Sequence, residues 1–266
     1  MPSWMRRKLR FLAINKPFAK LFGPLYRQNH YRIEIDIIYA CNLSCPNCDR
    51  FCSQVSSDER MSVEQIEKFV SQSIQQGRRW EQVALLGGEP TLHPDLLGMV
   101  EMLLSYKKTF YPPVRIQVVT NGNGTYVERV IKRLPAEVEV RNSHKTTQCQ
   151  RFYPVHLAPI DYPGYRFADY TNGCDNVKLC GLGLTPYGYY TSAVGGAIDR
   201  IFGFDVGRKT LPDVIDQMLE QRKLLCQYCG YFRRDEREVT DCLRLSAAWQ
   251  KAFARYRVER PKLSCY

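Results

Sequence analysis

The sequence contains no apolar run that approaches the ~18 residues a membrane-spanning helix needs. No compact apolar segment follows the early arginines, so we find no secretory signal and expect a cytoplasmic protein. The chain also has no internal repeat, no P-loop and no Rossmann glycine fingerprint. These absences argue against an integral membrane protein, a repeat protein and the common phosphate-binding folds.

Acidic residues are missing from the first 32 positions. Eight of the 38 basic residues lie there, and the other 30 are nearly balanced by 27 acidic ones. Residues 1–30 therefore form a basic arm. Apolar residues recur in it at helical spacing, with basic residues between them. They are Met5, Leu9, Leu12, Phe18, Leu21, Phe22 and Leu25.

Two interpretations of this arm are open. Residues 1–28 can lie on an anionic membrane surface or contact an acidic partner, which makes the protein peripheral to the membrane. Alternatively, the arm is a terminal helix that packs on the protein's own core, with its lysines in solvent.

Cysteine is abundant, with eleven residues, and three of them form a C-x₃-C-x₂-C pattern: Cys41, Cys45 and Cys48. The preceding residues 33–38 alternate between β-branched and polar types, which predicts a strand. The cysteines thus lie on a loop at the carboxyl end of that strand. An iron–sulfur cubane normally takes four thiolates, so three leave one iron open. A zinc site with three thiolates and one distant ligand is the alternative.

Strands and helices alternate from there to residue 160. We expect strands at 82–86, 114–120, 137–140 and 155–160, and helices at 62–76, 94–106 and 125–134. This order implies a parallel sheet with right-handed crossovers. Polar groups follow three of these strands. They are Gly87, Gly88, Glu89 and Pro90 after the second, Thr120 and Asn121 after the third, and Asn142 and Ser143 after the fourth.

The cysteine loop followed by the Gly-Gly-Glu-Pro turn resembles the radical S-adenosylmethionine (SAM) superfamily. The resemblance implies an α/β fold, an incomplete (β/α)₆ TIM-type barrel, with residues 31–165 as its core. It implies that Cys41, Cys45 and Cys48 hold a [4Fe–4S] cluster whose open iron binds SAM. By the same resemblance, the residues after the second strand meet the SAM amino group, and those after the third and fourth meet its ribose and carboxylate. One departure is Asn47, where the family usually has an aromatic residue.

The resemblance also implies an activity. Such an oxidoreductase cleaves SAM reductively to a 5′-deoxyadenosyl radical, which abstracts hydrogen from a substrate. The substrate is unidentified: a peptide, a sugar or a small alcohol. The electron donor is a flavodoxin or a ferredoxin, and no catalytic side chain is identified. The alternative is a non-catalytic iron–sulfur or zinc protein that binds nucleic acid through the basic arm.

Residues 166–235 contain a second cysteine set: Cys174, Cys180, Cys226 and Cys229. They resemble a shortened SPASM or twitch extension, a small cysteine-containing addition that holds an auxiliary iron–sulfur cluster. A structural zinc and unliganded cysteines are the alternatives. Helices are expected at 211–225, with Val214, Ile215, Met218 and Leu219 inward, and at 240–257 within the last segment, 236–266.

Other residues have modest roles in this interpretation. Cys149, Cys242 and Cys265 are structural or free cysteines, and His144 is a surface or capping residue. Cys52 is interpreted as a buried structural thiol, with a hydrogen-atom donor or a metal ligand as the alternatives. The cluster of Tyr187, Tyr189 and Tyr190 either lines a pocket or closes the core.

Overall fold

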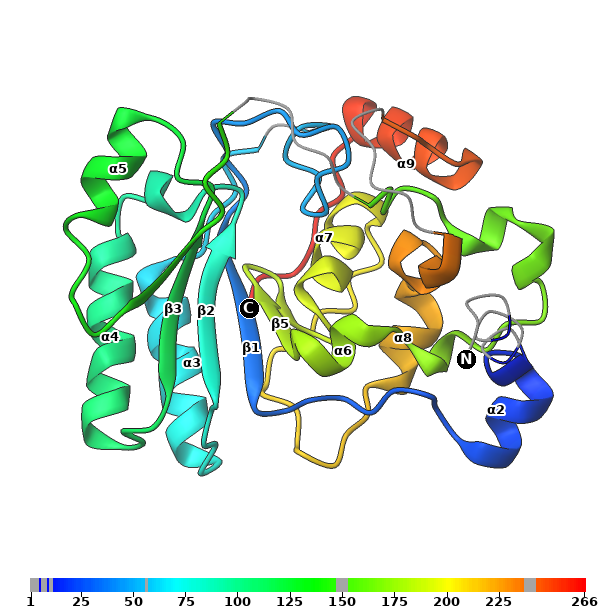
Figure 1. Ribbon diagram of the computed structural model, residues 1–266, viewed down its shortest axis with the longest axis horizontal. Coiled ribbons are helices and arrows are strands. Elements are labelled where there is room, and N and C mark those ends of the chain that lie inside the picture. Colours follow the sequence, from blue (N-terminus) through cyan, green and yellow to red (C-terminus); the bar gives the residue numbers. More distant parts are fainter. Residues whose placement is uncertain (1–4, 6–8, 10–11, 56, 147–152, 237–242) are drawn as a thin grey trace.

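A computed structural model describes residues 5, 9, 12–55, 57–146, 153–236 and 243–266 (Figure 1). Its centre is one six-stranded sheet with the order β4-β3-β2-β1-β5-β6. The strands are β1 (Arg32–Ile38), β2 (Gln82–Gly87), β3 (Arg115–Thr120), β4 (Glu139–Asn142), β5 (Leu182–Thr185) and β6 (Gly188–Tyr190). All neighbours pair in parallel except β5 and β6, which form an antiparallel hairpin. The sheet is open, as in an incomplete barrel, and β4 and β6 lie at its edges.

Helices connect the first four strands. They are α3 (Val63–Gln75), α4 (Leu96–Thr109) and α5 (Thr125–Ile131). In Figure 1, α3 and α4 lie on the same face of the sheet. The start of α3 is determined locally, because Ser62 and Gln65 form a reciprocal capping box. Ile66 and Phe69 on α3 pack with Trp80 in the core.

The fifth strand predicted at 155–160 is wrong. Residues 159–161 form a short 3₁₀ helix, η2 (Pro159–Asp161), which begins at a proline that cannot donate to a strand ladder. The strand on the free side of β1 is instead β5, some 25 residues later in the chain. Two more 3₁₀ helices, η3 (Pro163–Tyr165) and η4 (Tyr170–Asn172), occupy the interval.

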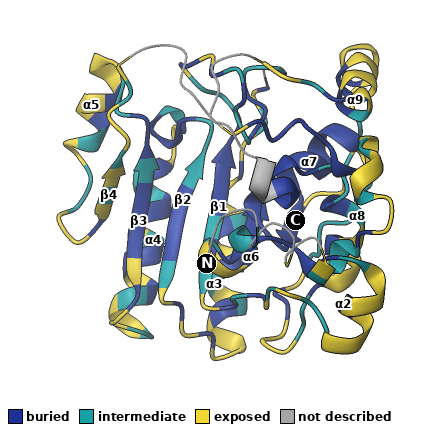
Figure 2. Ribbon diagram, turned by 45° about the vertical axis from the view of Figure 1, so that its right-hand side comes forward, coloured by how far each residue is buried: buried dark blue, intermediate teal, exposed yellow. Residues whose placement is uncertain are grey.

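The second half packs against the free side of β1. It contains α6 (Asp175–Leu179), α7 (Ala193–Phe202), α8 (Leu219–Leu225), η5 (Gly230–Glu236) and α9 (Ala247–Val258). Helix α7 is buried along its whole length, whereas α9 and α2 (Lys16–Phe22) show exposed faces (Figure 2). The tyrosines of the β5–β6 hairpin are buried, so Tyr187, Tyr189 and Tyr190 belong to the core.

The helix predicted at 211–225 begins only at Leu219. Val214, Ile215 and Leu219 are exposed, not inward, whereas Met218 is buried. The side chains of Asp213 and Asp216 accept hydrogen bonds from the backbone two residues later, which gives turns in place of a helix. The final helix is confirmed from Ala247 onward, while residues 240–242 of its predicted range lie outside the described residues.

The N-terminal arm packs on the body of the protein. Asn15 forms a β-bridge with Ala168, and Ile14 is buried with Phe232 and Cys226. The helix α2 follows directly. No helix among the described residues is long and apolar enough to span a membrane.

Candidate cluster and cofactor site

The cysteine loop leaves the sheet at the carboxyl end of β1 and returns beside it. Tyr39 N donates to Glu59 O, and Met61 N donates to Ile37 O. These backbone bonds hold the two ends of the loop together. Cys41, Cys45 and Cys48 thus lie on one closed excursion at the edge where cofactors bind in α/β barrels.

The turn after β2 packs tightly against the start of this loop. Gly88 N donates to Ile38 O at 2.7 Å, and Glu89 N donates to Ala40 O at 2.9 Å. A Cβ at Gly87 would overlap Ile38 O, and one at Gly88 would overlap Ala40 O. Gly87 also has φ +136°, which glycine adopts most readily. The two glycines therefore bring this turn against the cysteine loop.

Glu89 is fully buried and joins the turn after β2 to the turn after β3. Its Oε1 accepts hydrogen bonds from Thr91 N at 3.1 Å, Thr91 Oγ1 at 2.7 Å and Thr120 Oγ1 at 2.8 Å. Its Oε2 accepts one from Asn121 N at 2.8 Å. The structure thus gives Glu89 four partners within the protein. Its contact with the SAM amino group stays a prediction.

The turn after β3 reaches the cysteine loop through Asn121. Asn121 Nδ2 lies 2.8 Å from Asn42 Oδ1 and 3.9 Å from Cys41 Sγ. Asn42 Nδ2 in turn donates to Asn123 O at 2.7 Å. Asn121 is therefore placed beside the first cysteine, as expected of a residue near the cluster and SAM.

The turn after β4 lies beside the turn after β3. Ser143 Oγ donates to Thr120 O at 2.9 Å, and Asn142 Oδ1 accepts from His144 N at 2.8 Å. His144 has φ +45° in this turn, which agrees with its expected local role. All eight candidate SAM-contacting residues thus lie with the cysteine loop at one end of the sheet, while their contacts with SAM stay predictions.

The three thiols have different environments. Burial raises the pKa of Cys41 to about 11, although the Leu43 N–H, 3.4 Å from the sulfur, opposes this. A hydrogen bond from the Cys52 thiol lowers the pKa of Cys48 to about 7, although burial opposes it. Cys52 is therefore buried, as expected of a structural thiol, and is also a direct neighbour of a candidate cluster ligand.

The donor set agrees with an iron–sulfur cluster. Three thiols lie on one loop, and a backbone N–H already donates to one of them. Within the part of the chain that the structure describes, no group of three Cys, His, Asp or Glu side chains is arranged to hold one metal ion. A cubane takes one thiolate on each iron, so Cys41, Cys45 and Cys48 would hold three of its irons.

Two buried arginines contact each other at the cysteine loop, Arg50 within the loop and Arg200 on α7. Arg50 forms ion pairs with Glu34 at 2.8 Å, Asp49 at 3.0 Å and Asp36 at 3.1 Å. Burial raises the pKa of Asp36 to about 6, even though Arg50 opposes the change. Arg200 on α7 donates to Arg50 O at 3.0 Å. The sequence did not reveal this group of ion pairs. The charged Asp36 inside an isoleucine-rich strand does indicate that a buried carboxylate needs a basic partner.

Arg200 connects the second half of the chain to the cysteine loop. Besides Arg50 O, it contacts Glu59 and Tyr256 Oη, each at 3.2 Å. Its guanidinium lies 4.1 Å from the ring centroid of Tyr39. Helix α7 therefore contacts the cysteine loop through the side chain of Arg200.

The structure places Cys180 apart from the neighbouring Cys174 and Cys226, and it buries Cys229 between α8 and η5. Cys174 and Cys180 flank α6, and Cys226 follows α8. Cys174 lies near Cys226, and burial, together with that neighbour, raises the pKa of Cys226 to about 12. Cys180 instead lines a cavity of about 280 Å³ with Glu34, Arg50 and Tyr231. An auxiliary cluster on all four stays a prediction. Cys265 is exposed, while Cys149 and Cys242 lie outside the described residues.

Comparison with known proteins identifies the class. Residues 35–187, more than half of the chain, match the model of the radical SAM superfamily. The chain therefore belongs to the radical SAM superfamily, whose enzymes use a [4Fe–4S] cluster and SAM. This confirms the family, the fold class and the cofactors expected from the cysteine loop.

Individual relatives match a smaller part. A probable GTP 3′,8-cyclase of Pyrococcus horikoshii is 34% identical over 95 residues, 36% of this chain and 28% of that protein. The GTP 3′,8-cyclase of Aliarcobacter butzleri is 29% identical over 104 residues, 38% of this chain and 30% of that protein. The chain thus matches less than a third of the length of these curated relatives.

Two solved structures also align. BtrN in complex with AdoMet and 2-DOIA has 11% identity and a TM-score of 0.43 over 82% of this chain and 97% of that one. Streptococcus suis SuiB bound to S-adenosylmethionine has 17% identity and a TM-score of 0.31 over 49% of this chain and 28% of that one.

Proposed function

We propose that this protein cleaves SAM reductively and directs the resulting radical at a bound substrate. The observation that supports this most is the contact between the cysteine loop and the Gly87–Pro90 turn, made through Gly88 N and Glu89 N. When bound, the cluster and SAM would supply an electron and a 5′-deoxyadenosyl radical that abstracts hydrogen from an unactivated carbon.

The chain's own residues would bind, orient and shield these groups. Cys41, Cys45 and Cys48 would hold the cluster and leave one iron for SAM. Thr120, Asn121, Asn142 and Ser143 would contact the ribose and carboxylate of SAM, and Gly87, Gly88, Glu89 and Pro90 its amino group. Tyr39 and Phe51, both fully buried in the loop, would help to keep water from the site.

We further propose that Cys174, Cys180, Cys226 and Cys229 hold an auxiliary iron–sulfur cluster. Three of them are buried, and Cys174 and Cys226 are already neighbours. Cys180 would have to approach them when the cluster forms. Reconstituted protein should then contain about eight irons per chain, against about four if only the first cluster is present. Zinc in place of the second set of irons would support the structural-zinc alternative.

We propose a peptide, a sugar or a small alcohol as the substrate, and a flavodoxin or a ferredoxin as the electron donor. GTP cyclisation is a second candidate, favoured by the similarity to GTP 3′,8-cyclases. That similarity covers little more than a third of this chain. Adding GTP to the reduced enzyme with SAM tests it: a cyclised nucleotide detected by mass spectrometry supports the candidate, and unchanged GTP excludes it.

The main experiment is anaerobic reconstitution with iron and sulfide, followed by dithionite and SAM. We expect release of 5′-deoxyadenosine. Replacing Cys45 by alanine should abolish it and remove about four irons per chain, because one cluster ligand is lost. The matched control, Cys265→Ala, changes an exposed cysteine and should keep its iron. Full iron content without any 5′-deoxyadenosine would contradict the proposal and favour the non-catalytic alternative.

A further inference from the structure

The N-terminal arm presents apolar side chains to solvent. Leu21 is 75% exposed and Phe22 is 76% exposed. With Leu9, Leu12, Phe18 and Leu25, they make up six of the eighteen exposed large hydrophobic side chains found among the described residues. Such a concentration in one short segment is unusual, because isolated apolar residues on a surface are scattered.

Five of these six side chains, all but Leu21, line a groove. Its volume is about 460 Å³. It is lined by Leu9, Leu12, Ala13, Phe18, Phe22, Gly23, Pro24, Leu25 and Asn172. Asn172 is the one polar residue in this lining, and its amide is buried and bonded to Leu25 N at 2.8 Å. The groove therefore offers an apolar surface that fits hydrocarbon.

The arm is held in place, so these side chains cannot turn into the protein's own core. Ile14 and Ala19 occupy the inward side of the arm. Asn15 pairs with Ala168, and Lys16 N donates to Phe167 O at 3.0 Å. In Figure 1, α2 lies at a corner of the molecule, away from the sheet, and in Figure 2 its outer face is exposed.

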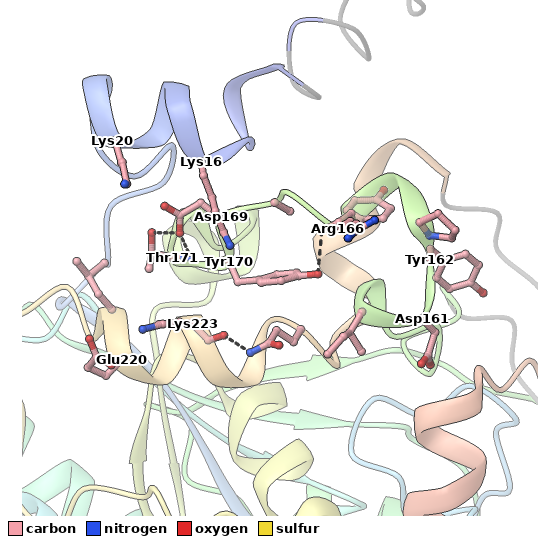
Figure 3. A pocket seen from close by; sticks show the side chains of 16 residues that line it. Lys16, Lys20, Asp161, Tyr162, Arg166, Asp169, Tyr170, Thr171, Glu220 and Lys223 are labelled. Carbon is pink, nitrogen blue, oxygen red and sulfur yellow. Dashed lines mark hydrogen bonds between the residues drawn. The ribbon is translucent and has the colours of Figure 1, made fainter.

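Basic side chains lie beside the apolar ones. Lys16 and Lys20, one helical turn apart, point from α2 into a neighbouring cleft of about 920 Å³ (Figure 3). The charged residues lining this cleft are Lys16, Lys20, Arg166 and Lys223, against Asp161, Asp169 and Glu220. Asp169 already accepts two hydrogen bonds from Thr171. The N-terminal sequence has a larger excess of positive charge than this cleft, since residues 1–32 contain eight basic residues and no acidic one.

We propose that this arm docks the protein on an anionic lipid surface. Apolar side chains would enter the boundary between headgroups and acyl chains, and the lysines would stay at the level of the phosphates. A second copy of the chain is a poorer occupant, because it would bring one basic arm against another. The proposal is independent of the SAM chemistry.

Vesicle sedimentation with the full-length protein tests this. We expect binding to vesicles of phosphatidylcholine mixed with phosphatidylglycerol, weak binding to phosphatidylcholine alone, and release by high salt. The double variant Leu21→Ser/Phe22→Ser should lower the partition coefficient at least about tenfold, because two large apolar side chains are lost from the interface. Lys16→Gln and Lys20→Gln should each lower it about fivefold, on anionic vesicles only.

Ile215→Ser is the matched control, since this side chain is 82% exposed but lies outside the arm. It should bind as the wild type does. The double variant should keep the wild-type circular dichroism, unfolding midpoint and 5′-deoxyadenosine release, which separates docking from folding and from catalysis. Three results would overturn the proposal: no vesicle binding, equal binding to both vesicle types, or a dimer in light scattering that the double variant abolishes.

Discussion

At the residue scale, Glu89 connects two of the loops that surround the candidate cluster. Its buried carboxylate accepts hydrogen bonds from Thr91, Thr120 and the backbone of Asn121. Removing the Glu89 carboxylate would leave its buried hydrogen-bond donors without an acceptor. This lowers the free energy of unfolding more than the loss of a solvent-exposed hydrogen bond does. Glu89 therefore has a positioning role that the motif alone does not reveal.

We predict that Glu89→Ala lowers the free energy of unfolding by about 3 kcal/mol, measured by urea denaturation. Glu89→Gln should lie between the alanine variant and the wild type, because its amide nitrogen would face the Asn121 N–H. The control Thr91→Val removes one of the four bonds and should cost about 1 kcal/mol. Wild-type stability in Glu89→Ala, with SAM binding lost, would show that the carboxylate acts on SAM and not on the loops.

His156 is a second buried polar residue with consequences for stability. Its ring packs against Phe51, Trp249 and Phe253. In the part of the chain that the structure describes, neither ring nitrogen has a hydrogen-bond partner. Burial lowers the pKa of His156 to about 3, so the ring is neutral in the folded protein at ordinary pH.

We therefore predict an acid-sensitive stability. Because the folded pKa lies below the unfolded one of about 6.5, the unfolded chain binds a proton that the folded chain does not, and stability falls as the pH drops below 6.5. At pH 5 His156 by itself should contribute a loss of about 2 kcal/mol, while Asp36, whose pKa is raised in the folded protein, contributes in the opposite direction.

Urea denaturation at pH 7.5 and at pH 5 would measure this loss. His156→Phe should shift the difference between the two pH values by about 2 kcal/mol relative to the wild type, whereas His144→Asn, at an exposed turn, should leave it unchanged. An equally steep pH dependence in His156→Phe would assign the effect to other groups.

At the element scale, the packing of α7 on β5 depends on the absence of a side chain at Gly183. A Cβ at Gly183 would overlap the backbone of Ser192 and Ala193, where α7 begins. Helix α7 can thus lie directly on the strand. Gly98 in α4 differs, because nothing lies within 4 Å of its would-be Cβ.

These two glycines make a matched pair for substitution. We predict that Gly183→Ala lowers the free energy of unfolding by about 3 kcal/mol, because backbone atoms cannot move aside easily. Gly98→Ala should raise it by about 0.5–1 kcal/mol, because alanine favours the helix. Thermal unfolding of both variants measures the contrast; a Gly183→Ala protein as stable as the wild type would mean that α7 can shift.

The sequence predicted elements well where local signals agree. The first strand is β-branched and alternates over its first half, the second and third are short apolar runs, and α3 begins at a capping box. It missed β5, because Leu182–Thr185 is short, contains glycine and lies in a stretch without alternation. It placed a helix at 211–218 from apolar spacing alone, although Asp213 and Asp216 stabilise turns there.

At the scale of the whole molecule, Arg200 joins the second half of the chain to the cysteine loop. It is buried, and its partners come from two separate parts of the sequence, Tyr39, Arg50 and Glu59 from the cysteine loop and Tyr256 from α9. Removing one member of a buried group of charges leaves the others uncompensated. The loop that holds the cluster is therefore coupled to α7.

We predict that Arg200→Met lowers the free energy of unfolding by about 3–5 kcal/mol. Arg200→Lys should recover part of this, because the charge remains but the forked donor geometry is lost. Arg129→Met, on the exposed side of α5, should stay within about 0.5 kcal/mol of the wild type. Equal stability of Arg200→Met and Arg129→Met in urea would contradict the coupling.

The sequence by itself determined the family, the cofactors and the residues of the four loops, because these depend on short motifs and on the period of local patterns. The tertiary structure alone decided that β1 pairs with β5, that Glu89 links neighbouring turns, and that Arg200 supports the cysteine loop. It also placed Cys174 beside Cys226 and left Leu21 and Phe22 exposed. Each of these depends on contacts between segments far apart in the chain, which no local pattern encodes.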